Sequence, residues 1–426
     1  MHGLRKRILH KVPGGILPWV LAFGLILATM ATLFILQASY WRQMAIDHRW
    51  QRQVHRTAAS GLAWVAAEPE NYPLGSTQVV LLPNDPPDTV LVTRQPWGIW
   101  TFAQAYARRG RYQAQQAQLL GHVPNTFGKA ALYITDQHRP IAIAGETTLK
   151  GTCYVPPAGV RTAYINWQGY RKAEKIFGQQ KESTSELPTL NREVYQAFLN
   201  QQIRWPQATS ALQDSLLRAD TVRWSFGHEQ PLFLNVRGTL RLRGHWEGYI
   251  LINASEGIIV EANTHLNQVI LQAPYITFAS GFEGTAQAWA RDSLRVDSLA
   301  RLHYPSALVL DAPTDRAKLT LGAKAGLAGT VVAFLPPDAT DLKLDAVLEP
   351  GSKVVGQVYW PDALELEAAT VMGQVVCKRF WLQIGGSRWE NTLFNTTIDA
   401  SLRPDSYRLP ALWGHQEAPL PMLILP

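Results

Sequence analysis

The chain has 426 residues, of which 46% are hydrophobic and 17% charged, so it is long enough for about two or three domains and is not a disordered polymer. Its two cysteines exclude a disulfide scaffold. The net charge of +7 comes entirely from residues 1–60, because the other 366 residues hold 32 basic and 32 acidic side chains. A neutral remainder does not indicate nucleic-acid binding.

An apolar run from Ile16 to Leu36 follows a basic leader, residues 1–15. Its 21 residues contain no ionisable side chain and would span about 31 Å as a helix, so they predict a transmembrane helix. A cleaved signal peptide has a shorter apolar region and a small-x-small site, whereas Leu36-Gln37-Ala38 has a leucine at the first position. The sequence therefore favours an uncleaved single-pass anchor over a signal peptide.

The distribution of positive charge predicts the orientation of this anchor. Four basic residues precede the apolar run and two lie in the first fifteen residues after it, with two more a little beyond. These residues are Arg5, Lys6, Arg7 and Lys11 before the run, and Arg42, Arg49, Arg52 and Arg56 after it. The positive-inside rule then puts the N-terminus in the cytoplasm. We expect an inner (cytoplasmic) membrane protein whose bulk is periplasmic or extracellular.

Residues 37–69 extend the helix beyond the membrane as an amphipathic stalk. The stretch has one glycine, Gly61, and no proline before Pro69. Apolar residues recur at the three-to-four spacing of one helical face, namely at Tyr40, Met44, Trp50, Val54, Ala58, Leu62 and Val65. A continuous helix from Ile16 to Ala67, about 78 Å long, is predicted.

This N-terminal region resembles the stalk of type IV pilin-like proteins. A basic leader, Gly15-Ile16 at the position of the leader-peptidase site and an amphipathic extension carry the resemblance. Val20 stands where the family has glutamate at the fifth mature position, and Pro18 stands where it has a helix former. A plain signal anchor followed by a spacer or dimerising helix is the alternative.

A small antiparallel β subdomain is predicted over residues 70–130. Strand-like runs occur at Thr77–Leu82 and Thr89–Thr93, on either side of a proline-rich turn. Trp97–Tyr106 and Gly110–Leu120 would form a hairpin around Arg108-Arg109-Gly110. The alternative is that this segment is the irregular start of the next region.

Residues 131–400 show short β runs with an imperfect repeat, whose period lies in the range typical of solenoid proteins. Three apolar triplets recur at equal spacings, and three Leu-x-Leu elements recur at slightly longer, nearly equal ones. They are Ile258-Ile259-Val260, Ile276-Thr277-Phe278 and Leu294-Arg295-Val296, then Leu319-Thr320-Leu321, Leu342-Lys343-Leu344 and Leu364-Glu365-Leu366. The last three lead to Gly329-Thr330-Val331, Gly356-Gln357-Val358 and Gly373-Gln374-Val375. Stacked copies of such a unit bury what one copy cannot, which predicts a right-handed parallel β-helix.

Two segments of this region depart from the repeat. Residues 180–220 contain a polar stretch and a helical pattern at Glu193–Gln202, so we expect an insertion that leaves one edge of the solenoid. Residues 401–426 lose the repeat and gain prolines, which suits a C-terminal cap or tail. A β-sandwich is the alternative fold, although it would have longer and more regularly alternating strands.

The Gly-Thr-Val and Gly-Gln-Val steps of the repeat resemble the bactofilins, which are polymer-forming β-helix proteins. The segments 150–156 and 269–284 are also similar to membrane-anchored, bactofilin-like relatives. The resemblance covers about residues 130–400 and implies a structural, polymer-forming role. The length, membrane span and long insertion depart from a typical bactofilin, as does the predicted exported location, since bactofilins are cytoplasmic.

No catalytic, cofactor-binding or metal-binding residues are predicted. The phosphate-binding, dinucleotide-binding, zinc-protease and nucleophile-elbow motifs are missing from the sequence. A carbohydrate-active β-helix would need aligned carboxylates, for which the candidates are Asp338, Asp341, Asp345 and Asp362, although turns favour aspartate in any case. Trp360, Trp381 and Trp389 would stack on sugars or in the core. Cys153 and Cys377 are expected as buried free thiols, because a solenoid would put them many rungs apart.

These features together favour a non-enzymatic structural or scaffold component of a cell-envelope assembly. Its partners would be the bilayer, further copies of the chain and other envelope proteins. Small residues at Gly24, Ala28, Ala31 and Thr32 would let anchor helices approach closely. A carbohydrate-binding or carbohydrate-cleaving envelope protein is the alternative.

Overall fold

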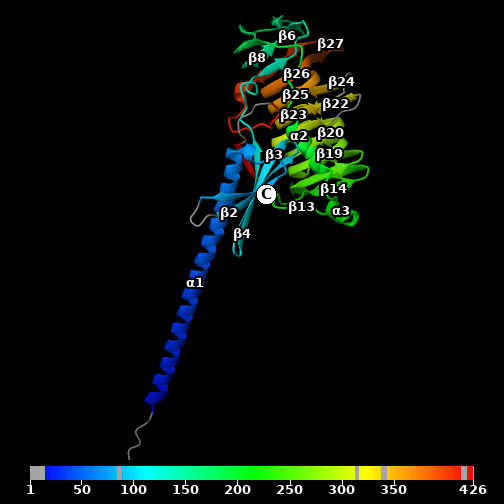
Figure 1. Ribbon diagram of the computed structural model, residues 1–426. Coiled ribbons are helices and arrows are strands. Elements are labelled where there is room, and N and C mark those ends of the chain that lie inside the picture. The colour runs from blue at the N-terminus through cyan, green and yellow to red at the C-terminus, as the bar shows by residue number, and fades with distance from the viewer. Residues whose placement is uncertain (1–14, 84–87, 312–315, 337–342, 414–419, 426) are drawn as a thin grey trace, which may run out of the picture.

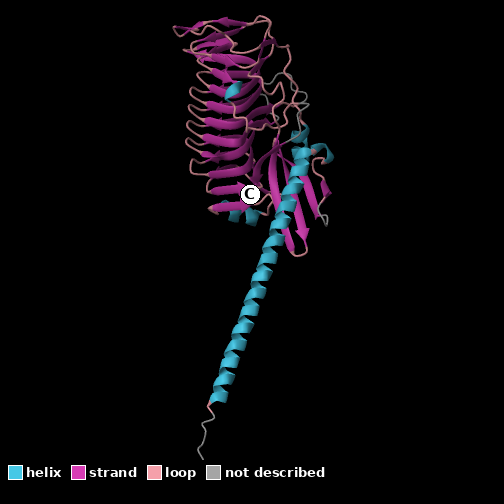
Figure 2. Ribbon diagram, turned by 90° about the vertical axis from the view of Figure 1, so that its left-hand side faces the viewer, coloured by secondary structure: helices cyan, strands magenta, loops and turns pink. Residues whose placement is uncertain are grey.

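The computed structural model describes residues 15–83, 88–311, 316–336, 343–413 and 420–425. The chain is mainly β, with one long apolar helix at its N-terminus (Figure 1). Three parts follow one another in space: helix α1, an antiparallel sheet packed on its second half, and a tall parallel stack of strands beside that sheet (Figure 2).

The helices are α1 (Ile16–Ala67), α2 (Glu193–Gln202) and α3 (Ser210–Leu217), with short 3₁₀ helices at Pro69–Asn71 and Ala400–Leu402. The antiparallel sheet contains β1 (Thr77–Leu82), β2 (Asp88–Trp97), β3 (Trp100–Arg109), β4 (Tyr112–Gly121) and β30 (Leu420–Leu425). The strands before the connecting segment 183–220, which we call the crossover, are β5 (Leu132–Ile134), β6 (Ile141–Ala144), β7 (Thr148–Lys150), β8 (Cys153–Val155), β9 (Val160–Thr162), β10 (Tyr164–Ile165), β11 (Gln168–Gly169) and β12 (Gln180–Glu182). The strands after it are β13 (Thr221–Trp224), β14 (Leu232–Val236), β15 (Thr239–Leu242), β16 (His245–Gly248), β17 (Ile250–Ala254), β18 (Gly257–Val260), β19 (His265–Phe278), β20 (Glu283–Val296), β21 (Arg301–Asp311), β22 (Arg316–Leu321), β23 (Gly326–Phe334), β24 (Lys343–Leu348), β25 (Lys353–Leu366), β26 (Thr370–Ile384), β27 (Ser387–Glu390), β28 (Thr392–Phe394) and β29 (Thr397–Asp399).

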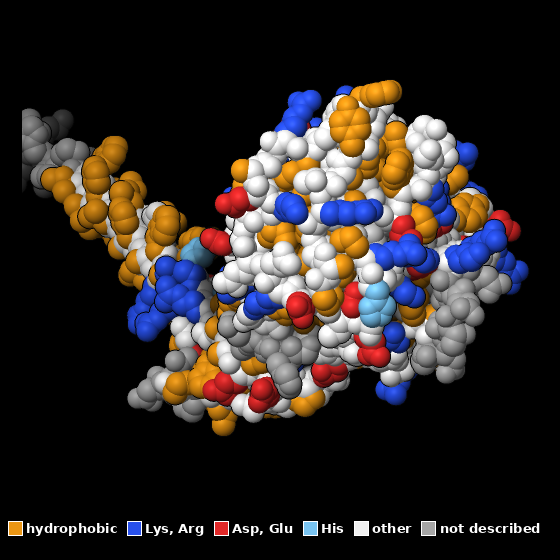
Figure 3. Space-filling view, turned by 90° about the horizontal axis from the view of Figure 1, so that it is seen from above, with side chains coloured by type: hydrophobic (Ala, Val, Ile, Leu, Met, Phe, Trp, Pro, Cys, Tyr) orange, Lys and Arg blue, Asp and Glu red, His pale blue; other side chains and the backbone are white. Residues whose placement is uncertain are grey.

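Helix α1 runs for 52 residues without a break, over the range predicted from the sequence. Its first part, up to Trp41, is exposed on every side and covered by apolar side chains (Figure 3). The second part buries one face against the sheet, formed by Val54, Ala58, Gly61, Leu62 and Val65. The amphipathic pattern is therefore confirmed for this part, whereas Tyr40 stays exposed because the sheet does not reach it. The helix ends before Pro69 as expected.

The antiparallel sheet has the strand order β1-β2-β3-β4-β30. Strand β1 and the hairpin around Gly110 lie where the sequence predicts them. The β2–β3 turn falls at Gly98 and Ile99, so Trp97 ends β2 and does not open β3 as predicted. Gly98 has a φ of +64°, a conformation that glycine adopts easily, and this places the turn directly after Trp97.

The strands of residues 132–399, apart from the small β10–β11 hairpin, form what we call the parallel stack. Most of their hydrogen-bonded pairings join into one closed, barrel-like set, and β28, β6 and β9 form a separate three-stranded sheet. One ladder brings Ile258, Ile276 and Leu294 into register as fully buried residues, which confirms the repeat predicted for them. These pairings are parallel, unlike the antiparallel sheets of the β-sandwich alternative.

A column of glycines marks where the strands of successive layers bend. Gly329, Gly356 and Gly373 pair in register, as the repeat predicts, with φ values of +152°, +142° and +144°. A Cβ added to Gly356 would lie 1.9 Å from the carbonyl oxygen of Gly329. Each glycine is therefore required by the backbone of the layer beneath it.

The predicted equivalence of Leu342-Lys343-Leu344 with Leu319-Thr320-Leu321 is wrong. Leu321 pairs with Leu348, and Leu348 pairs with Leu366, while Leu344 pairs with Ala317. Leu342 lies outside the described residues. Strand β24 alternates buried Leu344, Ala346 and Leu348, and an alternating pattern still fits after a shift of an even number of positions, here four.

The expected insertion at residues 180–220 is a crossover that changes the topology. Val375 of β26 pairs with Leu132 of β5, and Ile398 of β29 pairs with Leu149 of β7, so the first strands of the stack lie against the last ones. The chain must then travel from β12 at that end to β13 at the opposite end. Residues 183–220 make this passage, with α2 along the side of the stack (Figure 1).

The C-terminal segment, residues 401–426, does not cap the stack as expected. Its strand β30 pairs antiparallel with β4 and completes the edge of the first sheet. The ends of the stack are covered by other segments. Leu216 and Leu217, at the end of α3, pack on the core at the β13 end, and Tyr170 and Ile176 pack on it at the β12 end.

Candidate functional site

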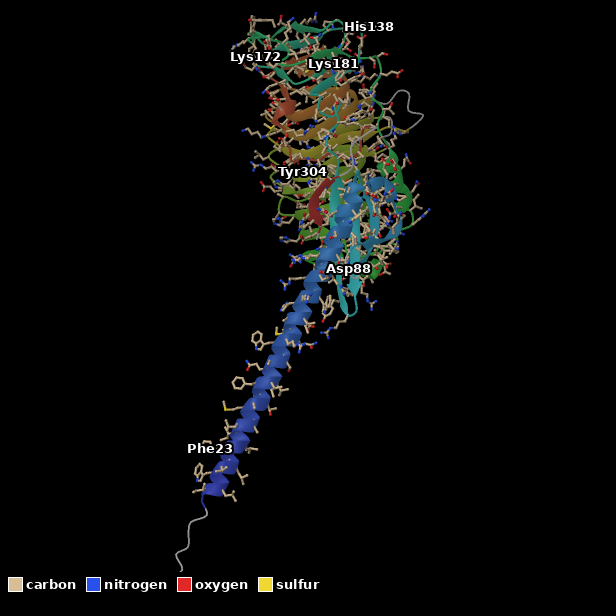
Figure 4. All side chains as sticks on the ribbon, turned by 60° about the vertical axis from the view of Figure 1, so that its left-hand side comes forward. Phe23, Asp88, His138, Lys172, Lys181 and Tyr304 are labelled. Atoms are coloured by element: carbon tan, nitrogen blue, oxygen red, sulfur yellow. The ribbon has the colours of Figure 1, made fainter. Side chains whose placement is uncertain are left out.

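The first functional element is the seat of α1 on the antiparallel sheet. Asp88, buried at the start of β2, accepts hydrogen bonds from Gln53 Nε2 at 2.8 Å and Thr57 Oγ1 at 3.1 Å (Figure 4). Arg109 Nη1 lies 3.2 Å from its other oxygen, and the Arg109 guanidinium also covers the ring of Trp50 at 4.2 Å. A buried carboxylate with three partners fixes the rotation of α1 against the sheet.

The second element joins this sheet to the parallel stack. Gln287 of β20 is buried and reaches the β2–β3 turn, where its Oε1 accepts from Ile99 N at 3.0 Å and its Nε2 donates to Trp97 O at 2.8 Å. Trp97 Nε1 in turn donates to Gln268 O at 3.1 Å. A Cβ on Gly98 would lie 1.9 Å from Gln287 Oε1, so the turn fits the amide without space for a side chain.

Aromatic rings surround this turn and form a core shared by the sheet, α2 and the stack. Trp97 packs edge-on against Tyr249 at 4.8 Å and Phe226 at 5.6 Å between ring centroids. Phe198 of α2 lies 6.4 Å from Trp97 and 5.0 Å from Trp289. These contacts bury large apolar areas from three parts of the chain. We call residues 97–100, together with Gln287 and these aromatic residues, the joint.

Sequence reasoning missed the joint. The prediction places Trp97-Gly98-Ile99-Trp100 within one strand, although a glycine between tryptophans is the signal of a tight turn. Nothing in the sequence distinguishes Gln287 from other polar residues on a strand.

A polar groove of about 490 Å³ lies between α2 and the side of the stack. It is lined by Gln202 of α2, by Asn253 and Gln272 of successive layers, and by Arg291 and Asp311. The Gln202 and Gln272 amides bond one another at 2.5 and 3.2 Å. A groove rich in amides beside Trp289 has the donors and acceptors for a hydroxylated ligand.

Asp311 is the carboxylate of this groove. Tyr195 of α2 donates to Asp311 Oδ1 at 2.5 Å. Burial raises the pKa of Asp311, and the hydrogen bond from Tyr195 opposes this rise only in part. Burial and the neighbouring Asp311 raise the pKa of Tyr195 as well, so the phenol remains the proton donor of the pair.

The candidate aspartates do not come together in a groove. Asp338 and Asp341 lie outside the described residues. Asp362 is buried and bonded to Arg379 Nη2 at 2.8 Å and to Leu344 N at 3.0 Å, which uses both of its oxygens for structure. Asp345 lies on an exposed position of β24. The two described members therefore differ in environment and do not form an acid–base pair.

The three tryptophans considered as sugar-stacking residues do not form one group either. Trp360 is fully buried in the core of the stack and donates to Leu344 O at 3.1 Å. Trp381 lies under the Arg388 guanidinium at 3.7 Å, and Trp389 is 43% exposed on the β26–β27 hairpin. Trp360 is thus a core residue, and the other two belong to one surface hairpin.

Cys153 and Cys377 are buried free thiols, as predicted, but the expected reason is wrong. Strand β5 pairs with β8 through Leu132 and Cys153, and with β26 through Ile134 and Cys377. One strand therefore separates the two cysteines by about 9.5 Å sideways, and they are also offset by two residues along it, which is too far for a disulfide. Within the ranges that the structure describes, no three His, Cys, Asp or Glu side chains gather as a group that could hold a metal ion.

No protein-family model matches the chain, and no curated protein matches it significantly.

Proposed function

We propose that the protein is a non-enzymatic, membrane-anchored structural component of a cell-envelope assembly, which holds the parallel stack in a fixed position relative to a bilayer. The observation that carries the proposal is the unbroken connection from α1 through Asp88 to the sheet, and through Gln287 to the stack. α1 is long and apolar enough to cross a membrane, with a mean hydropathy of 2.4 over its most apolar window. A rigid link of this kind suits a spacer or scaffold.

In this proposal the parallel stack is a right-handed β-helix of bactofilin-like style. The in-register glycine column and the buried apolar ladders support it. Segments cover the core at both ends, through Leu217 at one end and Ile176 at the other. This favours association through the anchor helix and the sides of the stack over end-to-end extension of its ladders.

We also propose that the N-terminus is cytoplasmic and the stack periplasmic or extracellular, in the inner (cytoplasmic) membrane. The support is the four basic residues of the leader against Arg42 and Arg49 just after the apolar run. Accessibility of a cysteine introduced at exposed Gln113 to an impermeant maleimide in intact cells tests it. Labelling only after the cells are broken would contradict this orientation.

Association through α1 is tested with the full chain in liposomes. Gly24, Ala28 and Ala31 are spaced along one side of the exposed part of α1, where small residues allow close helix contact. We expect chemical cross-linking to give dimers or larger species that Gly24→Leu with Ala31→Leu removes, while Leu33→Ala, a control at another exposed position, leaves them. A chain that stays monomeric at every protein-to-lipid ratio would contradict a self-associating scaffold.

A carbohydrate-binding role is the second candidate, favoured by the polar groove beside α2. Its test is calorimetric titration of the full chain in detergent with neutral oligosaccharides. Binding that Gln272→Leu abolishes while Gln196→Leu, on the exposed face of α2, retains would support this role. Absence of heat with every oligosaccharide would exclude it for those sugars.

A further inference from the structure

Aromatic residues mark the two edges of the lipid-facing part of α1. Trp19 is 69% exposed, and Tyr40 and Trp41 are each 62% exposed. Trp and Tyr concentrate at both membrane interfaces. Trp19 and Trp41 are separated by about 33 Å along a helix, which matches the hydrocarbon thickness of a bilayer. On this basis the lipid edge on the β side lies near Trp41, just beyond the end of the apolar run.

The β3–β4 hairpin reaches down α1 almost to this edge. Arg111 Nη2 lies 2.6 Å from Asp47 Oδ1, and the Tyr112 hydroxyl donates to the same carboxylate at 2.5 Å. These bonds lower the pKa of Asp47, so the carboxylate stays charged and holds the hairpin. Asp47 lies about 9 Å past Trp41 along the helix, and the headgroup layer is roughly 5–8 Å thick. The hairpin tip therefore lies at the outer boundary of the lipid headgroups, within reach of long arginine side chains.

Arginines surround α1 at this level. Arg42 and Arg49 are exposed. Because a helix turns by about 100° per residue, their positions fall on the face of α1 away from the sheet. Arg111 approaches α1 from the sheet side, whereas Arg108 lies near the tip of the same hairpin, on the face of the sheet opposite to Arg109, and its guanidinium bonds only to Gly110 O among the described contacts. We call these four residues the arginine collar. Figure 3 shows basic side chains gathered where the apolar helix meets the β region.

We propose that the arginine collar binds the headgroups of anionic lipids and thereby holds the antiparallel sheet against the membrane surface. The collar sets four cations against one carboxylate, Asp47, which is already used by Arg111 and Tyr112. Arginine forks match phosphate geometry, and their long side chains reach a nearby interface. The proposal rests on α1 being the membrane anchor, because only then is the collar next to a bilayer.

The test uses the full chain in nanodiscs with a spin label on cysteine at Gln113, an exposed position of the hairpin; the native cysteines are buried. The nanodiscs contain phosphatidylcholine alone or mixed with phosphatidylglycerol. We expect lower accessibility of the label to a nickel chelate in the mixed lipid, and a loss of this difference in high salt. Each arginine near an anionic surface should contribute about fivefold to the lipid-contacting population.

Two variants separate the collar from general effects of charge. Arg108→Gln with Arg42→Gln should remove the lipid dependence and leaves the Asp47 bonds to Arg111 and Tyr112 intact. Arg161→Gln with Arg171→Gln removes the same charge at the opposite end of the stack and should keep the dependence. Equal accessibility in both lipids, or a dependence that survives loss of Arg42 and Arg108, would overturn the proposal.

A separate measurement tests the anchor itself. Resistance of the full chain to alkaline carbonate extraction depends on α1 and not on lipid charge. A retained chain without lipid dependence would refute the collar alone, whereas a released chain would refute the anchor and the collar together.

Discussion

At the scale of single residues, the parallel stack depends on positions where the backbones of neighbouring layers touch. Gly356 is such a position, because its φ of +142° and its contact with the Gly329 carbonyl both exclude a side chain. Gly326 is a glycine of the same stack without these constraints, since the nearest atom to an added Cβ is 3.8 Å away.

Replacing Gly356 with alanine should therefore destabilise the folded chain by about 3 kcal/mol or more, through backbone strain and a clash. Gly326→Ala should change stability by less than about 1 kcal/mol. Urea unfolding of the two variants measures the difference. Equal stabilities would contradict the role given to the glycine column.

The two thiols give a second prediction at this scale. Burial raises the pKa of Cys153 to about 12 and that of Cys377 well above its usual value, and only the thiolate reacts rapidly. We expect both cysteines to resist iodoacetamide at pH 8 in the folded chain and to react once urea unfolds it, as read by mass spectrometry. Rapid modification of either thiol without denaturant would show that its surroundings open.

At the scale of elements, the seat of α1 on the sheet depends on close approach. A Cβ on Gly61 would lie 2.8 Å from Val90 Cγ2 and 3.2 Å from Val92 Cγ2, so the backbone of α1 packs directly against the side chains of β2. The exposed Ala63 follows shortly after it, at nearly the same level of the helix.

Gly61→Leu should push α1 off the sheet and cost about 1–3 kcal/mol, since a packed interface tolerates added volume poorly. Ala63→Leu adds a similar side chain to the exposed face and should leave the seat unchanged. Hydrogen exchange of the β2 amides reports the seat directly. Protection that is the same in both variants would contradict the close packing.

The elements also show which features a sequence can predict. Helices α1 and α2 are predicted at their observed bounds, because helical periodicity is a local signal and a proline follows α1. The register of β24 and the meaning of residues 180–220 are not predicted. Both depend on which strands become neighbours, and an alternating pattern does not identify a partner.

The candidate functional residues also divide into those that a local pattern predicts and those that depend on distant parts of the chain. The buried thiols are predicted, since they need only a compact core. The joint is missed because Trp97 and Gln287 are far apart in the chain and meet only after the stack is built.

At the scale of the whole molecule, the joint determines how the stack is carried by the anchor. Gln287 bonds both Ile99 N and Trp97 O in a buried position, so its loss removes a buried partner from each of these two backbone groups.

Gln287→Leu should therefore cost about 2–6 kcal/mol and allow the sheet to move against the stack. Distances between spin labels on the exposed residues Gln113 and Lys353 should broaden in this variant and remain narrow in Gln196→Leu, a control on the exposed face of α2. A narrow distribution in Gln287→Leu would show that the aromatic contacts alone hold the joint.

The return of the chain at residues 183–220 has a consequence for biosynthesis. Strands β5 and β7 leave the ribosome long before their partners β26 and β29, which follow them at a great distance along the chain. During this time the edge of β5 that pairs with β26 has no partner. Closing a loop over such a long span of chain is slow. The same delay applies to the first sheet, because the edge of β4 waits for β30, which follows the whole parallel stack in the chain. The layers from β13 to β26 can pair one after another as they are made, whereas the end formed by β5 and β7 and the edge of the first sheet close only after these layers are in place.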